Sequence, residues 1–142
     1  MAGYSGTPLV KKPGLKAGAA GLVLHTPQEY AALLGEIPPG ARLDSDWPHE
    51  CDALAAMYDF IHYFTRDRAT LEQDFPALKA ALKPDGVLWI SWPKGKSRLA
   101  ANLNENQVRE IGLAHQLVDV KVAAIDEDWS GLKFVYRLKD RP

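Results

Sequence analysis

The chain has 142 residues, of which 46% are hydrophobic and 25% are charged, a composition that excludes a fibrous or intrinsically disordered protein. Its 17 Lys and Arg residues nearly balance 18 Asp and Glu residues, so no overall field favours nucleic acid or an anionic membrane. No apolar run approaches the roughly 20 residues of a membrane span, and Cys51 is the single cysteine. We therefore expect one cytoplasmic domain over residues 1–142, with no disulfide, no nucleic-acid partner and no membrane partner.

The first half of the chain predicts a few short elements. Residues 1–17 form an N-terminal extension or a short helix. Residues 20–25 are an apolar run between Gly18 and Pro27, which is typical of a strand buried on both faces. A short helix over 28–34 and a short strand over 41–43 follow, and an acidic, proline-containing connection leads to the second half.

The second half gives stronger patterns. Residues 57–64 are rich in aromatic and branched residues and predict a strand, after which Thr65 or Asp67 can cap a helix. Pro76 should kink that helix, because proline removes a backbone donor. One face of the helix is apolar, with Leu71, Phe75, Leu78 and Leu82 at spacings of three and four residues.

Residues 83–86, Lys-Pro-Asp-Gly, predict a turn in which Gly86 can take a positive φ, and residues 87–91 predict a buried strand. Asn104 and Gln107 have the spacing of a capping box, which predicts a helix that runs to about His115. Alternating apolar residues over 118–124 and 132–138 predict two further strands joined around 126–131, which form an antiparallel edge.

Strands that alternate with helices predict right-handed crossovers and a mainly parallel sheet. The expected fold class is therefore α/β, a single three-layer Rossmann-like domain with an antiparallel C-terminal strand pair.

Two resemblances follow from these motifs. The order YDFIHYF, helix, LKPDGVLWISW, helix and two closing strands, over about residues 57–138, resembles the latter half of class I S-adenosylmethionine-dependent methyltransferases. The segments YSGTPLVKKPG, LKPDGVLWISWPK and LVDVKVAAIDEDWSGLKFV together resemble a family of short bacterial proteins known as a domain of unknown function. Membership of that family implies the fold and supplies no activity.

A methyltransferase of this fold binds its cofactor through a glycine-rich loop after the first strand, because only glycine lets the backbone approach the ligand closely. Here that loop begins with His25 and Thr26, followed by Pro27, and contains no glycine. An acid that holds a ribose could be Asp44 or Asp46, although either is more often a solvated loop carboxylate. We therefore expect no cofactor, with S-adenosylmethionine as the alternative.

A basic segment follows the strand over 87–91. Lys94, Lys96 and Arg98, with Ser97 among them, could hold a phosphate or carboxylate beyond the strand end. Trp92 would offer a stacking surface. The competing interpretation is a solvated loop with Trp92 packed in the core.

Other candidate sites are weaker. No P-loop, G-x-G-x-x-G or G-x-S-x-G motif occurs. His25 and His62 lie near predicted strand ends and could act as acid or base, but a histidine satisfied by a backbone carbonyl is the commoner case. The acids of 126–131 lack calcium-loop spacing, and His49 and Cys51 lack a second zinc-ligand pair, so we expect no metal.

These observations leave three hypotheses. The first is a non-catalytic domain that binds a small anionic molecule or a protein partner at residues 92–98. The second is a reduced S-adenosylmethionine-dependent methyltransferase that uses His25, Thr26 and an acid from 44–46, a hypothesis that rests on likeness of fold. The third is a homo-oligomeric interaction protein with an exposed edge strand over 132–138.

Overall fold

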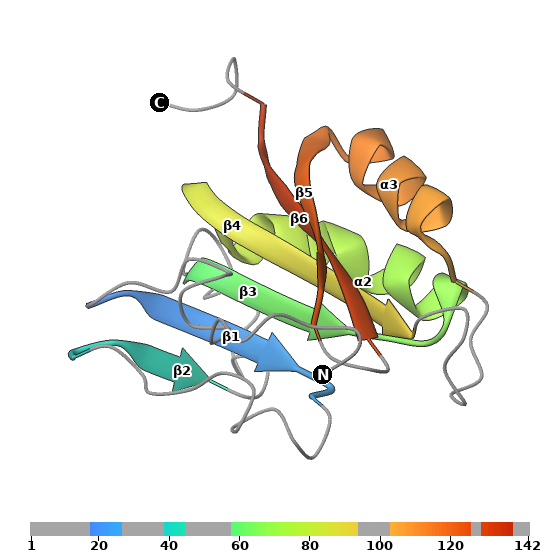
Figure 1. Cartoon of the computed structure of the whole chain (residues 1–142). Helices are drawn as coiled ribbons and strands as arrows, with labels where there is room; N and C mark the ends of the chain where they lie inside the picture. The colour runs from blue at the N-terminus through green and yellow to red at the C-terminus, as the bar shows by residue number, and fades with distance from the viewer. Residues whose placement is uncertain (1–17, 27–38, 45–57, 94–102, 126–128, 138–142) are drawn as a thin grey trace.

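The computed structural model describes residues 18–26, 39–44, 58–93, 103–125 and 129–137. Within them no helix is long and apolar enough to span a membrane. The predicted helix over 28–34 and the segment 1–17 lie outside the described residues. The described elements, labelled as in Figure 1, are β1 (Ala20–Leu24), β2 (Arg42–Asp44), β3 (Tyr58–Phe64), α2 (Arg68–Ala81), β4 (Leu82–Pro93), α3 (Glu105–Ala114), β5 (Leu117–Ala124) and β6 (Trp129–Tyr136).

The described strands form one six-stranded sheet in the order β2-β1-β3-β4-β6-β5 (Figure 1). β1 pairs in parallel with β2 and β3, and β3 pairs in parallel with β4. β6 runs antiparallel to both of its neighbours, β4 and β5. This mainly parallel sheet with an antiparallel pair confirms the predicted Rossmann-like α/β fold class.

The position of the last two strands differs from the prediction. The expected edge strand over 132–138 is wrong, because β6 lies between β4 and β5, with Leu132 and Phe134 fully buried. The connection from β4 through α3 to β5 skips one strand position in the sheet, and β6 occupies that position. β5 is therefore the edge, and its expected apolar alternation fails: a bulge lies between Asp119 and Lys121, and Val120 and Val122 are 54% and 49% exposed.

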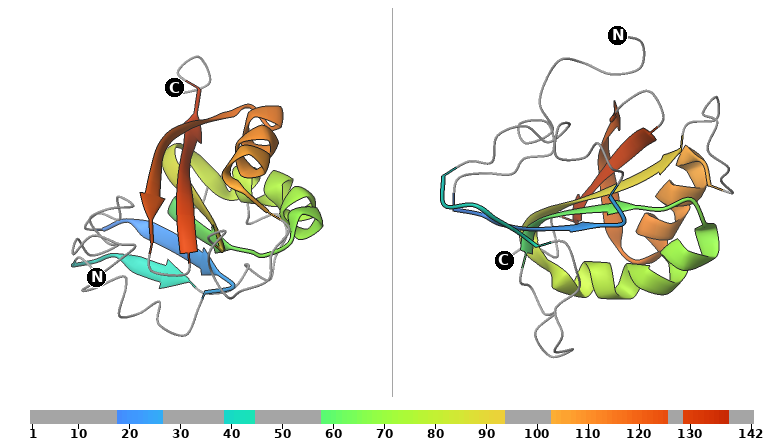
Figure 2. Two further views of the ribbon diagram at one scale, coloured as in Figure 1. Left: turned by 45° about the vertical axis from the view of Figure 1, so that its right-hand side comes forward. Right: turned by 90° about the horizontal axis from the view of Figure 1, so that it is seen from below.

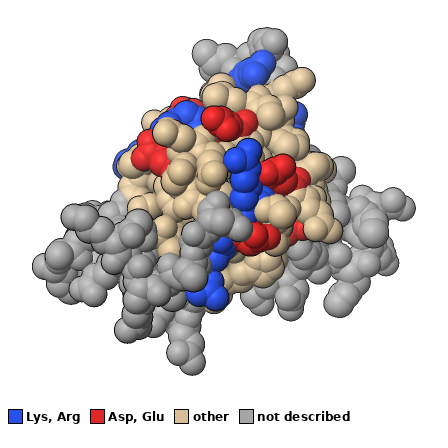
Figure 3. All heavy atoms as spheres, turned by 90° about the vertical axis from the view of Figure 1, so that its right-hand side faces the viewer, with Lys and Arg blue, Asp and Glu red and all other residues tan. Residues whose placement is uncertain are grey.

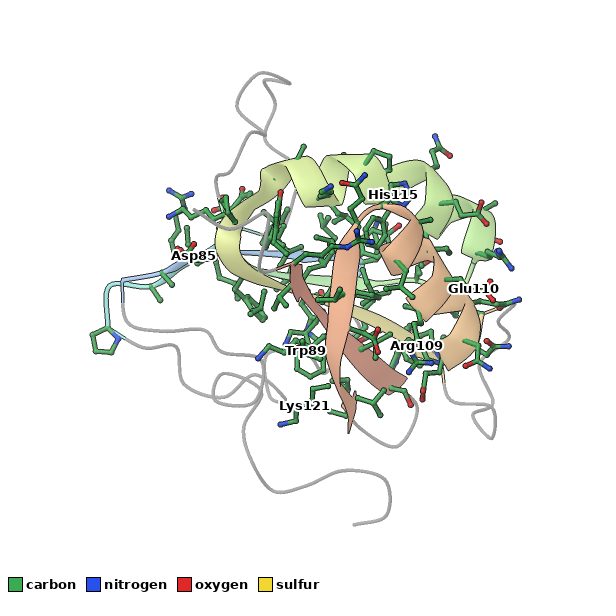
Figure 4. The ribbon with its side chains drawn as sticks, turned by 90° about the horizontal axis from the view of Figure 1, so that it is seen from above. Asp85, Trp89, Arg109, Glu110, His115 and Lys121 are labelled. Atoms are coloured by element: carbon green, nitrogen blue, oxygen red, sulfur yellow. The ribbon has the colours of Figure 1, made fainter. Side chains whose placement is uncertain are left out.

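Both described helices lie on the same side of the sheet (Figure 2). A helix-side cluster fills the space between them and the sheet, and a smaller opposite-face cluster lies on the other side, where Figure 4 shows Trp89 pointing away from α2. The described residues include no helix on that second side, so the predicted third layer lies outside them. The opposite-face cluster contains Val23, Phe60, Phe64, Trp89, Ile125 and Trp129.

The helix boundaries follow their local signals. Asp67 is the N-cap of α2, and its side chain accepts a hydrogen bond from the Thr70 backbone N–H at 3.0 Å. α2 includes Pro76 and ends at Ala81, so Leu82 belongs to β4 and not to the predicted helical face. The capping box of Asn104 and Gln107 is confirmed at the start of α3.

The predicted turn over 83–86 is instead part of β4. β3 and β4 align Tyr58 with Leu82 and then Phe60 with Val87, so the intervening residues of β4 form a wide bulge opposite Asp59. Gly86 has no positive φ; among the described glycines only Gly18 and Gly40 do. A Cβ on Gly86 would lie 2.8 Å from the Asp59 carbonyl oxygen. Glycine is needed there because the two strands approach closely.

Candidate functional site

The sheet reverses its strand order beside β1. β2 lies on one side of β1, and β3, the next strand in the chain, lies on the other. In open α/β sheets, ligands bind outside the carboxyl ends of the strands at such a switch point. The topology therefore selects the edge where β1 ends at Leu24 and β3 ends at Phe64.

His25 is the first residue after β1 and lies at this switch point. Its φ of 58 is in the left-handed region, which non-glycine residues rarely adopt. Its ring Nδ1 donates a hydrogen bond to the Phe64 carbonyl oxygen at 3.2 Å, and the ring centroid lies 5.1 Å from that of Tyr63. His25 thus links the ends of β1 and β3 while its side chain stays exposed. Thr26, the next residue, is also exposed.

Most of the residues between β3 and α2 make hydrogen bonds that fix the start of α2. The Thr65 backbone N–H donates to the Ser91 carbonyl at 3.0 Å. The Thr65 hydroxyl donates to the Asp67 carbonyl at 3.3 Å and accepts from the Asp67 N–H at 3.2 Å. Arg66, between them, is exposed. Arg66 is therefore the cation at this strand end that sequence reasoning missed, because it belongs to no motif.

Asp44, one of the two acids considered for a ribose, is occupied by its neighbours. Its carboxylate accepts a hydrogen bond from the Tyr58 hydroxyl at 2.7 Å and forms an ion pair with Arg42 at 3.4 Å. Burial, followed by the hydrogen bond to Asp44, raises the pKa of Tyr58 to about 12. Asp44 thus ties β2 to the start of β3. Asp46 lies outside the described residues.

Trp92 does not provide the predicted stacking surface. It is 5% exposed and belongs to the helix-side cluster, so the interpretation as a core residue is the correct one. The other residues proposed for an anion site, Lys94, Lys96, Ser97 and Arg98, lie outside the described residues. An anion site there stays a prediction.

His62 is a buried structural residue and not an acid or base at a strand end. It is fully buried in β3, and its Nε2 lies 2.7 Å from the Ser91 hydroxyl oxygen. Its ring stacks on Phe64 with 4.2 Å between centroids. Burial lowers the pKa of His62 to about 3, so the ring is neutral near pH 7.

A separate groove of about 500 Å³ lies between α2 and α3. Within it, Arg68 Nε forms an ion pair with Glu72 Oε1 at 2.7 Å. His115 lies at the end of α3, where Nδ1 donates to the Ile111 carbonyl at 2.8 Å (Figure 4). The face in Figure 3 shows cations and acids interspersed, so no single sign of charge dominates it. The groove is lined by Arg68, Glu72, Glu110, Ile111, Ala114 and His115.

The sequence matches no protein-family model and no curated protein. The resemblance to a family of short bacterial proteins therefore stays a prediction.

Among the described residues, no group of three or more His, Cys, Asp or Glu side chains is arranged to hold a metal ion.

Solved structures with the same fold include several methyltransferases. A SAM-dependent methyltransferase from Aquifex aeolicus has a TM-score of 0.64 and 16% identity, over 89% of this chain and 86% of that chain. A tRNA methyltransferase from B. subtilis has a TM-score of 0.60 and 12% identity, over 97% and 69% of the two chains. The Burkholderia thailandensis 1,6-didemethyltoxoflavin-N1-methyltransferase, solved with bound S-adenosylhomocysteine, has a TM-score of 0.54 and 13% identity, over 89% and 73%. This chain therefore has the Rossmann-like fold of the SAM-dependent methyltransferases.

Proposed function

We propose that this chain is a methyltransferase-like domain that binds S-adenosylmethionine outside the carboxyl ends of β1 and β3. The main support is the backbone of His25, which turns out of β1 with a φ of 58 at the point where the strand order reverses. The structural neighbours support the same ligand class, because several of them are SAM-dependent methyltransferases.

The residues at this edge fit such a ligand through the shape of the turn. Glycine serves in cofactor loops because it can adopt a left-handed conformation and brings the backbone near the ligand. His25 adopts that conformation although it has a side chain. The missing glycines therefore do not exclude a tight turn after β1.

Exposed groups at the two strand ends would hold the ligand. Thr26 supplies a hydroxyl after β1, and Arg66 supplies a cation after β3 that can pair with a carboxylate. Bound S-adenosylmethionine would supply an activated methyl group. The role of Thr26 and Arg66 in this proposal is to bind and orient the ligand.

Calorimetry and NMR with the full chain test the proposal. Titration with S-adenosylhomocysteine should release heat, and the amide signals of His25, Thr26 and Arg66 should shift. Signals of Leu113 and Ala114 should stay unchanged, because these residues belong to the end of α3 and not to the ends of β1 and β3. No heat and no shifts at millimolar ligand would refute the proposal, and shifts confined to Ala114 and its neighbours would place the ligand in the groove instead.

A pair of arginine variants sharpens this test. Arg66→Ala should weaken binding of S-adenosylhomocysteine by about tenfold, the effect of losing one charge-assisted hydrogen bond of roughly 1.5 kcal/mol. Arg68→Ala is the matched control, because Arg68 lies two residues further on and is paired with Glu72. Equal weakening by both variants would show a general loss of positive charge and would contradict the role of Arg66.

A further inference from the structure

The hydrogen bond of His25 determines which of its ring nitrogens can act as an acceptor. The Phe64 carbonyl oxygen can only accept, so Nδ1 of His25 must hold a hydrogen. In the neutral ring, Nε2 then has a free lone pair. Among the described residues, Nε2 of His25 has no hydrogen-bond partner, and the side chain is exposed. His25 therefore presents a fixed acceptor at the switch point.

The backbone of His25 points to a role beyond the fold. Gln116 is the other described non-glycine residue with a positive φ, at 70, and it follows the end of α3. Its N–H donates to the Leu113 carbonyl at 3.0 Å, which is the ordinary way to end a helix with a left-handed residue. His25 ends a strand and closes no helix. An unfavourable conformation with no such local reason is typical of functional sites.

The described carboxylates near this edge are already in use. Asp44 accepts a hydrogen bond from Tyr58 and pairs with Arg42. Asp67 accepts hydrogen bonds from the backbone and hydroxyl of Thr70, at 3.0 Å and 2.7 Å. Among the described side chains at this end of the sheet, Nε2 of His25 is therefore an acceptor that still has no partner.

We infer that Nε2 of His25 accepts a hydrogen bond from a ribose hydroxyl of an adenosyl ligand, so that the site selects ligands with an intact ribose. This inference rests on the proposed function and adds to it the group that recognises the sugar. His25 acts here as a binding residue, because its Nε2 would accept a hydrogen bond from the ligand and take part in no bond-making step.

The test compares the affinity for S-adenosylhomocysteine with that for its 2′,3′-dideoxy analogue. The natural chain should bind the intact ligand about five- to tenfold more tightly, the effect of one hydrogen bond of roughly 1 kcal/mol. His25→Gly keeps the left-handed turn and removes the acceptor, so this preference should disappear. His25→Asn is the matched control: asparagine tolerates the left-handed conformation. Its amide can donate to Phe64 and still accept from the ligand, so part of the preference should remain.

Each result separates the inference from the function on which it rests. Binding of both ligands with equal affinity would overturn the inference and leave the proposed function standing. A preference that survives in His25→Gly would show that another group recognises the ribose. No binding of either ligand would overturn both proposals. Imidazole ¹⁵N shifts of the ligand-free chain give an independent check, because a hydrogen on Nε2 at neutral pH would contradict the acceptor role.

Discussion

Mild acid should destabilise this fold through the buried side chain of His62. Burial lowers its pKa from the ordinary 6.5 to about 3, and its Nε2 lies 2.7 Å from the Ser91 hydroxyl oxygen. Between about pH 3 and pH 6.5, the unfolded chain binds a proton at His62 that the native chain does not bind. The free energy of unfolding therefore rises with pH over this interval, and the contribution of His62 is lost as the pH falls from 6.5 toward 3.

The size of this effect follows from the two pKa values. Each pH unit below 6.5 lowers the free energy of unfolding by up to about 1.4 kcal/mol. Between about pH 7.5 and about pH 5 the expected loss from His62 is about 2 kcal/mol. That loss is a large fraction of the roughly 5–15 kcal/mol by which small domains are stable.

Urea unfolding of the natural chain and of His62→Gln at both pH values measures the loss. Glutamine can keep a hydrogen bond to Ser91 and does not titrate, so the variant should lose about 2 kcal/mol less than the natural chain on acidification. NMR of the imidazole C–H signals gives a second readout that does not depend on the variant. If the His62 signal titrates near pH 6.5, as that of an exposed histidine does, the reasoning from burial is wrong.

Two substitutions test contacts between elements of the fold. Gly112→Ala should destabilise the chain by about 2 kcal/mol in urea unfolding, because the new Cβ would overlap the Phe134 ring. Helix propensity alone predicts a gain of about 1 kcal/mol, so a stabilised variant would contradict the packing. Tyr58→Phe should cost about 1 kcal/mol through loss of the hydrogen bond to Asp44. An unchanged urea midpoint would show that Asp44 does not depend on Tyr58.

Elements with local signals could be predicted from the sequence. The cap of α2 at Asp67 and the capping box of Asn104 and Gln107 are confirmed, because each consists of groups within three residues of one another. β3 is recognisable because aromatic and branched residues are concentrated in it, a pattern that depends on composition alone. The parallel sheet followed from the alternation of strands and helices.

The candidate site could be predicted only in part. His25 and Thr26 were named because they follow the first strand, and the structure places them at the switch point. Trp92 was named as a ligand surface and is buried in the core, because the side of a strand that faces the helices depends on packing. Arg66 belongs to no motif, so only the ends of β1 and β3 in space identify it.

By itself, the sequence determined the two described helices, most of the described strands and the α/β class, because hydrophobic period, caps and prolines act over a few neighbouring residues. Only the tertiary structure decided that β6 lies inside the sheet, that residues 83–86 bulge within β4, and that His62 is neutral. It also decided that His25 meets the carbonyl of Phe64, 39 residues away in the chain. Contacts of that kind form only when strands far apart in the sequence pair in the sheet, which no local pattern encodes.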